Sequence, residues 1–165
     1  DSIDSIQQIL KKAEVPIRAF IVGDGEEKEN LFKYLNLKKL DFSQDSKRAT
    51  FQFTSWIKEI DEVNAGMDII CLCSLNEGTP VSLIEAQASG IPIVSTKTGG
   101  IENIVIDNKS ALLSENNDLN SFSNNLLTLI NNPSKREFLS RHGEVKSKEF
   151  HYSNLVTNIK KLYKF

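Results

Sequence analysis

The sequence predicts an α/β fold built on a parallel sheet. Short apolar runs typical of buried strands alternate with longer segments in which apolar residues recur every three or four positions. Strands that alternate with helices favour a parallel sheet that is covered on both faces. The chain has 165 residues, of which 39% are hydrophobic and 25% charged, and this suits one folded domain with its own core. We therefore expect a single Rossmann-like domain over residues 1–165.

The first part of the chain begins with a helical pattern. Ile3, Ile6 and Ile9 have the spacing of one helix face, so residues 2–14 are expected to be helical, and Pro16 follows as a breaker. The next expected elements are a strand at 18–22, a helix at 26–37, a polar loop at 41–47, a strand at 50–53 and a helix at 57–65.

The second part opens with the most apolar strand, residues 68–73. Cys71 and Cys73 alternate in it, and we interpret them as thiols buried on one face of the strand. Beyond it we expect a helix at 80–89 closed by Gly90, strands at 91–95 and 110–113, a short helix at 101–105, and helices at 119–131, 133–150 and 153–164.

Charge and cysteine content exclude several classes of protein. The formal net charge is −2, so the chain as a whole has no footprint for nucleic acid. No further Cys or His lies near the two cysteines in the sequence, so no metal site is expected there. The cysteine content fits a reducing cytosol, and no apolar stretch has the length of a membrane span.

Ligands of an open α/β sheet bind outside the carboxyl ends of its strands. The first such loop, residues 23–25, resembles the start of a dinucleotide-binding fingerprint. However, Lys28 stands where a third glycine or alanine is needed, and Glu26 and Glu27 would repel a pyrophosphate. We interpret this loop as a tight turn. The other strand-end loops are residues 54–56, 74–80 and 96–100.

The loop at 74–80 leads into a helix and has the features of an anion site. We expect Thr79 to cap this helix and Pro80 to be its first residue. The free amides of the first turn and the helix dipole attract negative charge, and Gly78 lets a ligand approach the backbone. A diphosphate fits such a site without any lysine.

Two glutamates flank this helix start. Glu77 precedes it, and Glu85 follows Thr79 by roughly 9 Å of helical rise. A nucleotide sugar carries hydroxyls on both sides of its diphosphate, and carboxylates bind paired hydroxyls well. The spacing alone leaves another interpretation open, because the helix dipole by itself favours glutamate near a helix start.

Residues 77–100 read EGTPVSLIEAQASGIPIVSTKTGG. This run resembles the donor-binding signature of retaining GT-B glycosyltransferases of the group 1, or family 4, type. Glu77 and Glu85 match the Glu-x7-Glu motif of that family, and residues 98–100 match its glycine loop. Weaker matches lie at 20–25 and 53–56, and the resemblance extends over residues 3–164. It implies the C-terminal half of a GT-B fold.

The resemblance also implies roles for individual residues. Glu77 would be the catalytic residue, because it would contact the hydroxyls of the donor sugar and help to stabilise the developing positive charge. Glu85 would hold the ribose hydroxyls. The other donor-binding positions implied are Gly78, Thr79 and Pro80 at the diphosphate, Ser55 and Trp56 near the base, and Gly99 and Gly100 beside the sugar-phosphate region.

By the same resemblance, the parent protein would be a retaining hexosyltransferase that uses a UDP- or GDP-sugar in polysaccharide or glycolipid synthesis. It would need no metal or other cofactor, because amides and basic side chains neutralise the leaving diphosphate. Its acceptor, a sugar or lipid-linked sugar, would bind an N-terminal domain. That domain, the first strand of this one and an Arg–Lys clamp would lie outside this sequence, so the chain alone is expected to be inactive. The parent would be cytoplasmic, and peripheral association with the inner face of the membrane stays open.

Three alternatives remain. The chain could be a non-catalytic domain that binds a nucleotide sugar, or a nucleotide-sugar epimerase with the same nucleotide site. It could also be another Rossmann-like regulatory domain. A receiver domain would carry a phosphoacceptor Asp after its central strand, where this sequence has residues 74–77, Ser-Leu-Asn-Glu.

Overall fold

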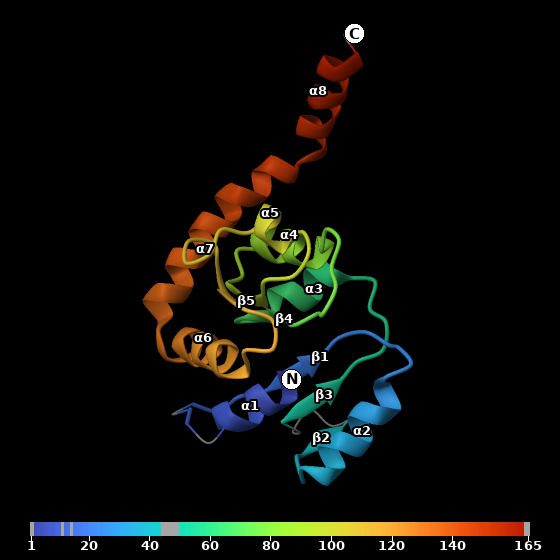
Figure 1. Cartoon of the computed structure of the whole chain (residues 1–165), viewed down its shortest axis with the longest axis vertical. Helices are drawn as coiled ribbons and strands as arrows, with labels where there is room; N and C mark the ends of the chain where they lie inside the picture. Colours follow the sequence, from blue (N-terminus) through green and yellow to red (C-terminus); the bar gives the residue numbers. More distant parts are fainter. Residues whose placement is uncertain (1, 11, 14, 44–49, 164–165) are drawn as a thin grey trace. The chain divides into compact units, whose positions relative to one another are not determined.

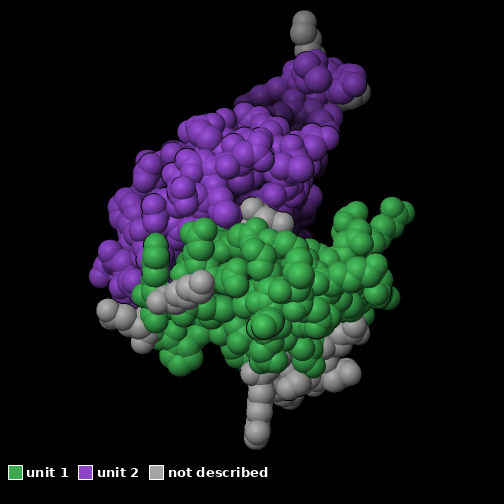
Figure 2. Space-filling view, turned by 60° about the horizontal axis from the view of Figure 1, so that its bottom comes forward, with its two compact units in different colours: residues 1–60 green, residues 61–165 purple. Residues whose placement is uncertain are grey.

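The computed structural model describes residues 2–10, 12–13, 15–43 and 50–163. The chain divides into two compact units, which we call the first unit (Asp1–Ile60) and the second unit (Asp61–Phe165) (Figure 2). Each unit contains a three-stranded parallel sheet with helices packed on it. The predicted α/β class with parallel strands and flanking helices is therefore confirmed, although the described strands form two sheets.

The sheet of the first unit has the order β1-β3-β2, with β1 at Ala19–Ile21, β2 at Phe42–Ser43 and β3 at Phe51–Phe53. Strand β2 was not expected, because its surroundings at 41–47 are polar. Phe42 pairs with Phe51 in the sheet, and its ring stacks on that of Phe32 at a centroid distance of 5.3 Å. The side chain of Phe42 therefore anchors a strand that the polar residues around it do not indicate. Residues 44–49 of the expected loop lie outside the described residues.

Two helices complete the core of the first unit. Helix α1 (Ser2–Leu10) supplies Ile3, and helix α2 (Lys28–Leu37) supplies Leu35. Both side chains are buried with Phe51 and Phe53 of β3. Helix α1 is shorter than the 2–14 expected, and residues 11 and 14 of that range lie outside the described residues.

The sheet of the second unit has the order β4-β5-β6, with β4 at Ile70–Leu72, β5 at Ile93–Thr96 and β6 at Ala111–Ser114. All three strands were predicted. Every residue of β5 and β6 is buried, as strands of a parallel sheet covered on both faces should be.

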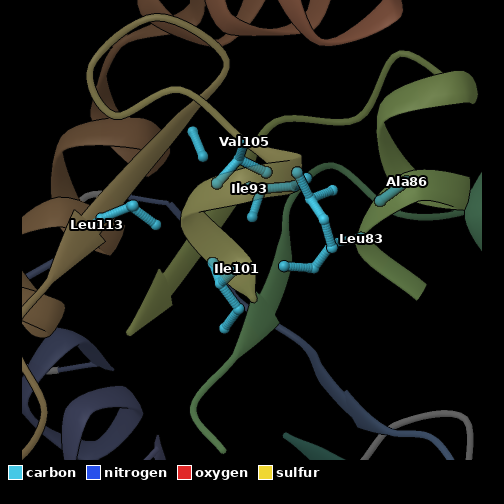
Figure 3. Packing of buried hydrophobic residues seen from close by; sticks show 8 residues of the cluster. Leu83, Ala86, Ile93, Ile101, Val105 and Leu113 are labelled. Carbon is cyan, nitrogen blue, oxygen red and sulfur yellow. The ribbon is translucent and has the colours of Figure 1, made fainter. Parts of the chain in front are cut away.

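Helices α4 (Val81–Ala88) and α5 (Ile101–Ile104) cover one face of this sheet. Figure 3 shows Leu83 of α4, Ile101 of α5, Ile93 of β5 and Leu113 of β6 as members of one buried cluster. The remaining buried members are Ala86, Ile104, Val105 and Ala111. The start of α4 is thus anchored to the sheet through its inner face.

The C-terminal helices are α6 (Leu119–Asn131), α7 (Pro133–Ser147), the 3₁₀ turn η1 (Lys148–Phe150) and α8 (Tyr152–Tyr163). Helix α6 contacts β5 and β6, and α7 packs on α4 where Gly143 adjoins Gln87. Helix α8 extends away from the sheet of its unit (Figure 1). In the described part of the chain, no helix has the length and apolar character needed to cross a bilayer. A short helix, α3 (Ile60–Ala65), precedes β4.

The interpretation of Cys71 and Cys73 as buried thiols is wrong, because both are free and exposed. Ile70 and Leu72 take the face of β4 that packs against the core. The cysteines alternate with them and so point to the other face, which α6 covers mainly over β5 and β6. The apolar run at 68–73 therefore predicts the strand, but it does not reveal that the two cysteines of this strand are exposed.

Leu83 tests this account of the core. We expect Leu83→Ala to lower the free energy of unfolding by about 2–5 kcal/mol, because it removes a fully buried side chain and leaves a cavity. Val81→Ala is the matched control in the same helix, since Val81 is 60% exposed, and it should change stability by no more than about 0.5 kcal/mol. Urea unfolding followed by circular dichroism measures both; equal effects would contradict this packing.

Candidate functional site

The candidate site lies in the second unit, at the edge of the sheet where its strands end. Because β4, β5 and β6 are parallel, the segments that follow them emerge at the same edge. These segments are residues 74–80, 96–100 and 115–118, and the last was not among the loops expected to bind ligand. The strand ends thus bring together two of the predicted loops and add a third.

Helix α4 begins one residue later than predicted. Pro80 is its N-cap, with φ −70° and ψ 100°, and Val81 is its first residue, so Thr79 lies outside the helix. No side chain caps this end. Proline has no backbone N–H, so Pro80 cannot donate to a phosphate as the expected site would require. The N–H donors that the first turn can offer are those of Val81 and Ser82, together with the dipole behind them.

The surface around this helix start is open. Gly78 and Thr79 are exposed, as are Val81 and Ser82, whereas Pro80 is buried. A side-chain carbon placed on Gly78 would meet no described atom within 4 Å. Apart from Pro80, the residues of this stretch thus lie at the surface.

Glu77 and Glu85 lie on either side of the helix start. Glu77 is half-buried in the loop before α4, and Glu85 is exposed on α4 itself. Neither carboxylate forms a hydrogen bond or an ion pair with another side chain of the described residues. Among the described residues, two carboxylates without a side-chain partner thus flank a helix start whose first two residues are exposed.

Gly99 and Gly100 have a structural task at this site. Gly99 has a left-handed backbone, with φ +55°, and a β carbon on it would overlap the carbonyl oxygen of Glu77. A β carbon on Gly100 would overlap the carbonyl oxygen of Gly78, to which the Gly100 amide donates at 3.0 Å. These two glycines thus let the loop after β5 cross directly against the backbone of Glu77 and Gly78.

Hydroxyl groups at the end of β5 hold the end of β4. Ser95 Oγ donates to the Leu72 carbonyl at 2.9 Å, and Thr96 Oγ1 donates to the Ser74 carbonyl at 3.2 Å. Both side chains are buried. Sequence reasoning missed this pair; a signal that could have found it is two hydroxyl residues ending a strand that is otherwise apolar.

The segment after β6 holds the loop after β5 in turn. The amide of Lys97 donates to the Ser114 carbonyl at 2.8 Å, and Lys97 Nζ pairs with Glu115 at 2.8 Å. The hydrogen bond and charge of Glu115 raise the pKa of Lys97, which stays cationic at neutral pH. One step further, Thr98 Oγ1 donates to Asn116 Oδ1 at 2.6 Å. Neither Glu115 nor Asn116 was singled out from the sequence.

The remaining predicted base-binding residues, Ser55 and Trp56, follow β3 in the first unit and are described with that unit alone. Both are exposed, and the indole of Trp56 is not part of a core. At the first loop, Asp24 accepts from the Gly25 amide and pairs with Lys28, while Gly23 has φ +122°. These contacts agree with a tight turn that closes on itself.

No group of three or more His, Cys, Asp and Glu side chains that could hold a metal ion occurs among the described residues. The expectation of a reaction without metal or cofactor rests on the resemblance and stays a prediction.

Comparison with known proteins gives a consistent result. The family model described as "Glycosyl transferases group 1" matches residues 1–146. An uncharacterized glycosyltransferase of Haemophilus influenzae is 30% identical over 94% of this chain and 42% of its own length. An Escherichia coli protein, UDP-Gal:alpha-D-GlcNAc-diphosphoundecaprenol alpha-1,3-galactosyltransferase, is 30% identical over 75% of the chain and 31% of its own length. The chain thus spans less than half the length of these relatives.

Solved structures show the same fold. TarM aligns with a TM-score of 0.82 and 20% identity over 99% of this chain and 32% of that one. Anabaena HepE, solved in complex with UDP, aligns with a TM-score of 0.79 and 18% identity over 98% of this chain and 44% of its own. At these identities the likeness concerns the fold, so the site itself must be tested on this chain.

Gly99→Ala tests the crossing of the two loops. We expect it to lower the free energy of unfolding by about 1–3 kcal/mol from backbone strain alone, and to shift the amide resonances of residues 77–79 because the added carbon displaces the Glu77 carbonyl. Gly78→Ala is the control, with open space around it, and should leave stability unchanged or raise it by up to about 1 kcal/mol. Urea unfolding and NMR spectra measure the two effects; a silent Gly99→Ala would contradict the crossing.

Proposed function

The chain belongs to the group 1 glycosyl transferases, and from this membership we propose that it binds the nucleotide-sugar donor of such an enzyme. The observation that carries the proposal is the start of α4. Val81 and Ser82 begin the helix and are exposed residues, and in the sequence they stand between Glu77 and Glu85, two carboxylates that have no described side-chain partner. A diphosphate with a ribose on one side and a sugar on the other matches this order of groups.

The first step of the proposed mechanism is binding of the diphosphate at the helix start. Its negative charge meets the N–H groups of the first turn and the positive end of the helix dipole. Glu85 accepts hydrogen bonds from the ribose hydroxyls, and these charge-assisted bonds fix the nucleotide. The same amides stabilise the extra charge that develops on the leaving diphosphate, which favours the transition state over the bound donor.

Glu77 acts on the sugar side. As the glycosidic bond to the diphosphate breaks, positive charge develops on the donor sugar. The Glu77 carboxylate binds the sugar hydroxyls and offsets this charge, which makes it the catalytic residue of this proposal. Transfer with retention of configuration, and without a metal ion, is part of the proposal. The half-buried setting of Glu77 supports its role, because the field of a charge is stronger where water is partly excluded.

We propose UDP as the nucleotide of the donor, with a hexose as its sugar, and GDP as the alternative. Two names support UDP: the Escherichia coli relative is a UDP-Gal transferase, and HepE was solved with UDP and with UDP-glucose. The proposed base contacts are Ser55 and Trp56, of which the exposed indole can stack on a base.

The acceptor is proposed to be a sugar or a lipid-linked sugar in polysaccharide or glycolipid synthesis, held by an N-terminal domain of a longer protein. The diphosphoundecaprenol acceptor in the name of the Escherichia coli relative supports a lipid-linked sugar. Such an acceptor would place the enzyme in the cytoplasm, at the inner face of the membrane.

The nucleotide site is tested by titrating the 165-residue chain with UDP and with GDP in the absence of metal, followed by calorimetry. We expect UDP to bind, and Glu85→Ala to weaken it by about 10–100-fold, because a hydrogen bond to a charged group contributes about 1.5–3 kcal/mol. Glu62→Ala, an exposed glutamate of α3, is the matched control and should keep the wild-type affinity. If UDP binds equally to all three proteins, Glu85 is not a ribose ligand.

Glu77→Gln separates binding from catalysis. We expect it to leave the affinity for UDP within about threefold, because UDP has no donor sugar, but to remove the extra affinity of UDP-glucose. In a longer protein with sugar transfer activity, kcat should fall by about 100-fold or more through the loss of charge stabilisation. Transfer that survives in Glu77→Gln would contradict the catalytic role. A wild-type protein that binds donor and transfers nothing would favour the non-catalytic alternative.

A further inference from the structure

Three segments of the second unit form a chain of contacts that ends at the proposed catalytic carboxylate. Residues 114–116 bind residues 97–98, and residues 99–100 cross the backbone of Glu77 and Gly78. We propose that Asn116 and Thr98 form a positioning pair for Glu77. They act through residues 99–100, which follow Thr98 and contact the backbone of Glu77. This inference rests on the proposed function, which assigns Glu77 to the donor sugar.

Thr98 is a buried residue, with 7% of its surface exposed. A buried hydroxyl needs a hydrogen-bond partner, and Thr98 finds it in Asn116 Oδ1 at 2.6 Å. The neighbouring contacts of Lys97 with Ser114 and Glu115 bind the same two segments together. The exposed ion pair adds little to this link, whereas the buried hydroxyl leaves a desolvated group unpaired if its partner is removed.

The next link runs from Thr98 to the crossing. The Thr98 carbonyl accepts from the Ile101 amide at 3.2 Å, which closes the turn that contains both glycines. Within that turn the Gly100 amide donates to the carbonyls of Gly78 at 3.0 Å and Glu77 at 3.4 Å. A displacement of Thr98 therefore moves the Gly100 amide, whose hydrogen bonds hold the backbone of Glu77 and Gly78.

If Thr98 only filled space in the fold, a side chain of the same shape without the hydroxyl would serve equally well. Thr98→Val keeps the shape of the side chain and removes the hydroxyl, and Thr98→Ser keeps the hydroxyl. Asn116→Ala removes the acceptor from an exposed residue, where folding should tolerate the change. Thr128→Val is the matched control, because the hydroxyl of Thr128 donates within α6, to the Asn124 carbonyl at 2.7 Å.

The experiment measures two quantities on the 165-residue chain: hydrogen exchange of the Gly100 amide without ligand, and affinity for UDP-glucose relative to UDP. We expect Thr98→Val and Asn116→Ala to speed Gly100 exchange by about tenfold and to weaken UDP-glucose by about fivefold more than UDP. Thr98→Ser and Thr128→Val should match the wild type in both.

Two results would overturn the inference. Unchanged Gly100 exchange in Thr98→Val would break the link to the crossing, and equal losses of UDP-glucose binding in Thr98→Val and Thr98→Ser would show that the hydroxyl has no positioning role. In both cases the wild type still binds donor, so the proposed function stands. If the wild type binds neither UDP nor UDP-glucose, the proposed function fails, and the positioning role fails with it.

Discussion

The backbone contact between Gly99–Gly100 and Glu77–Gly78 is the constraint on which the second unit's candidate site depends. It holds the loop after β5 so close to the loop after β4 that a side chain on either glycine would overlap a carbonyl oxygen. The position of Glu77 and the path of the chain into α4 follow from this contact. Leu83 of α4 packs in the same core as Ile93 of β5, and this packing holds α4 on the sheet.

Support for the contact comes from both sides of the sheet edge. The hydroxyls of Ser95 and Thr96 fasten the end of β4 to β5, and the segment after β6 fastens the loop after β5. These polar groups are buried or partly buried, so their bonds are worth more than the same bonds at the surface. The site is thus built on three neighbouring strand ends, and each loop has its partner on the next strand.

Much of this arrangement could be predicted from the sequence. The strands that become β4, β5 and β6 are apolar runs between turn residues, and Gly78, Pro80 and Glu85 mark the helix that follows β4. Such local patterns reveal the spacing of apolar residues and the positions of turn-forming residues, and both depend only on neighbours in the sequence. Gly99 and Gly100 were assigned through the resemblance alone, as positions beside the sugar-phosphate region, and their contact with the backbone of Glu77 and Gly78 was not expected.

Other features depend on contacts between residues distant in sequence, and local patterns do not contain them. The partner of the two glycines is the Glu77–Gly78 backbone, about 20 residues earlier. Strand β2 exists because Phe42 meets Phe32 and Phe51, not because its neighbours are apolar. The contact of Asn116 with Thr98 and the exposure of Cys71 and Cys73 on β4 likewise follow from the order of the strands in the sheet.

On this chain, the proposed anion site would use the backbone N–H groups of Val81 and Ser82 at the start of α4. Every residue except proline carries the same N–H group, so these two positions can change identity over evolution without loss of the phosphate donors. The crossing glycines have no such freedom, since any side chain there meets a carbonyl oxygen. Residue identity should therefore vary widely at Val81 and Ser82 and very little at Gly99 and Gly100.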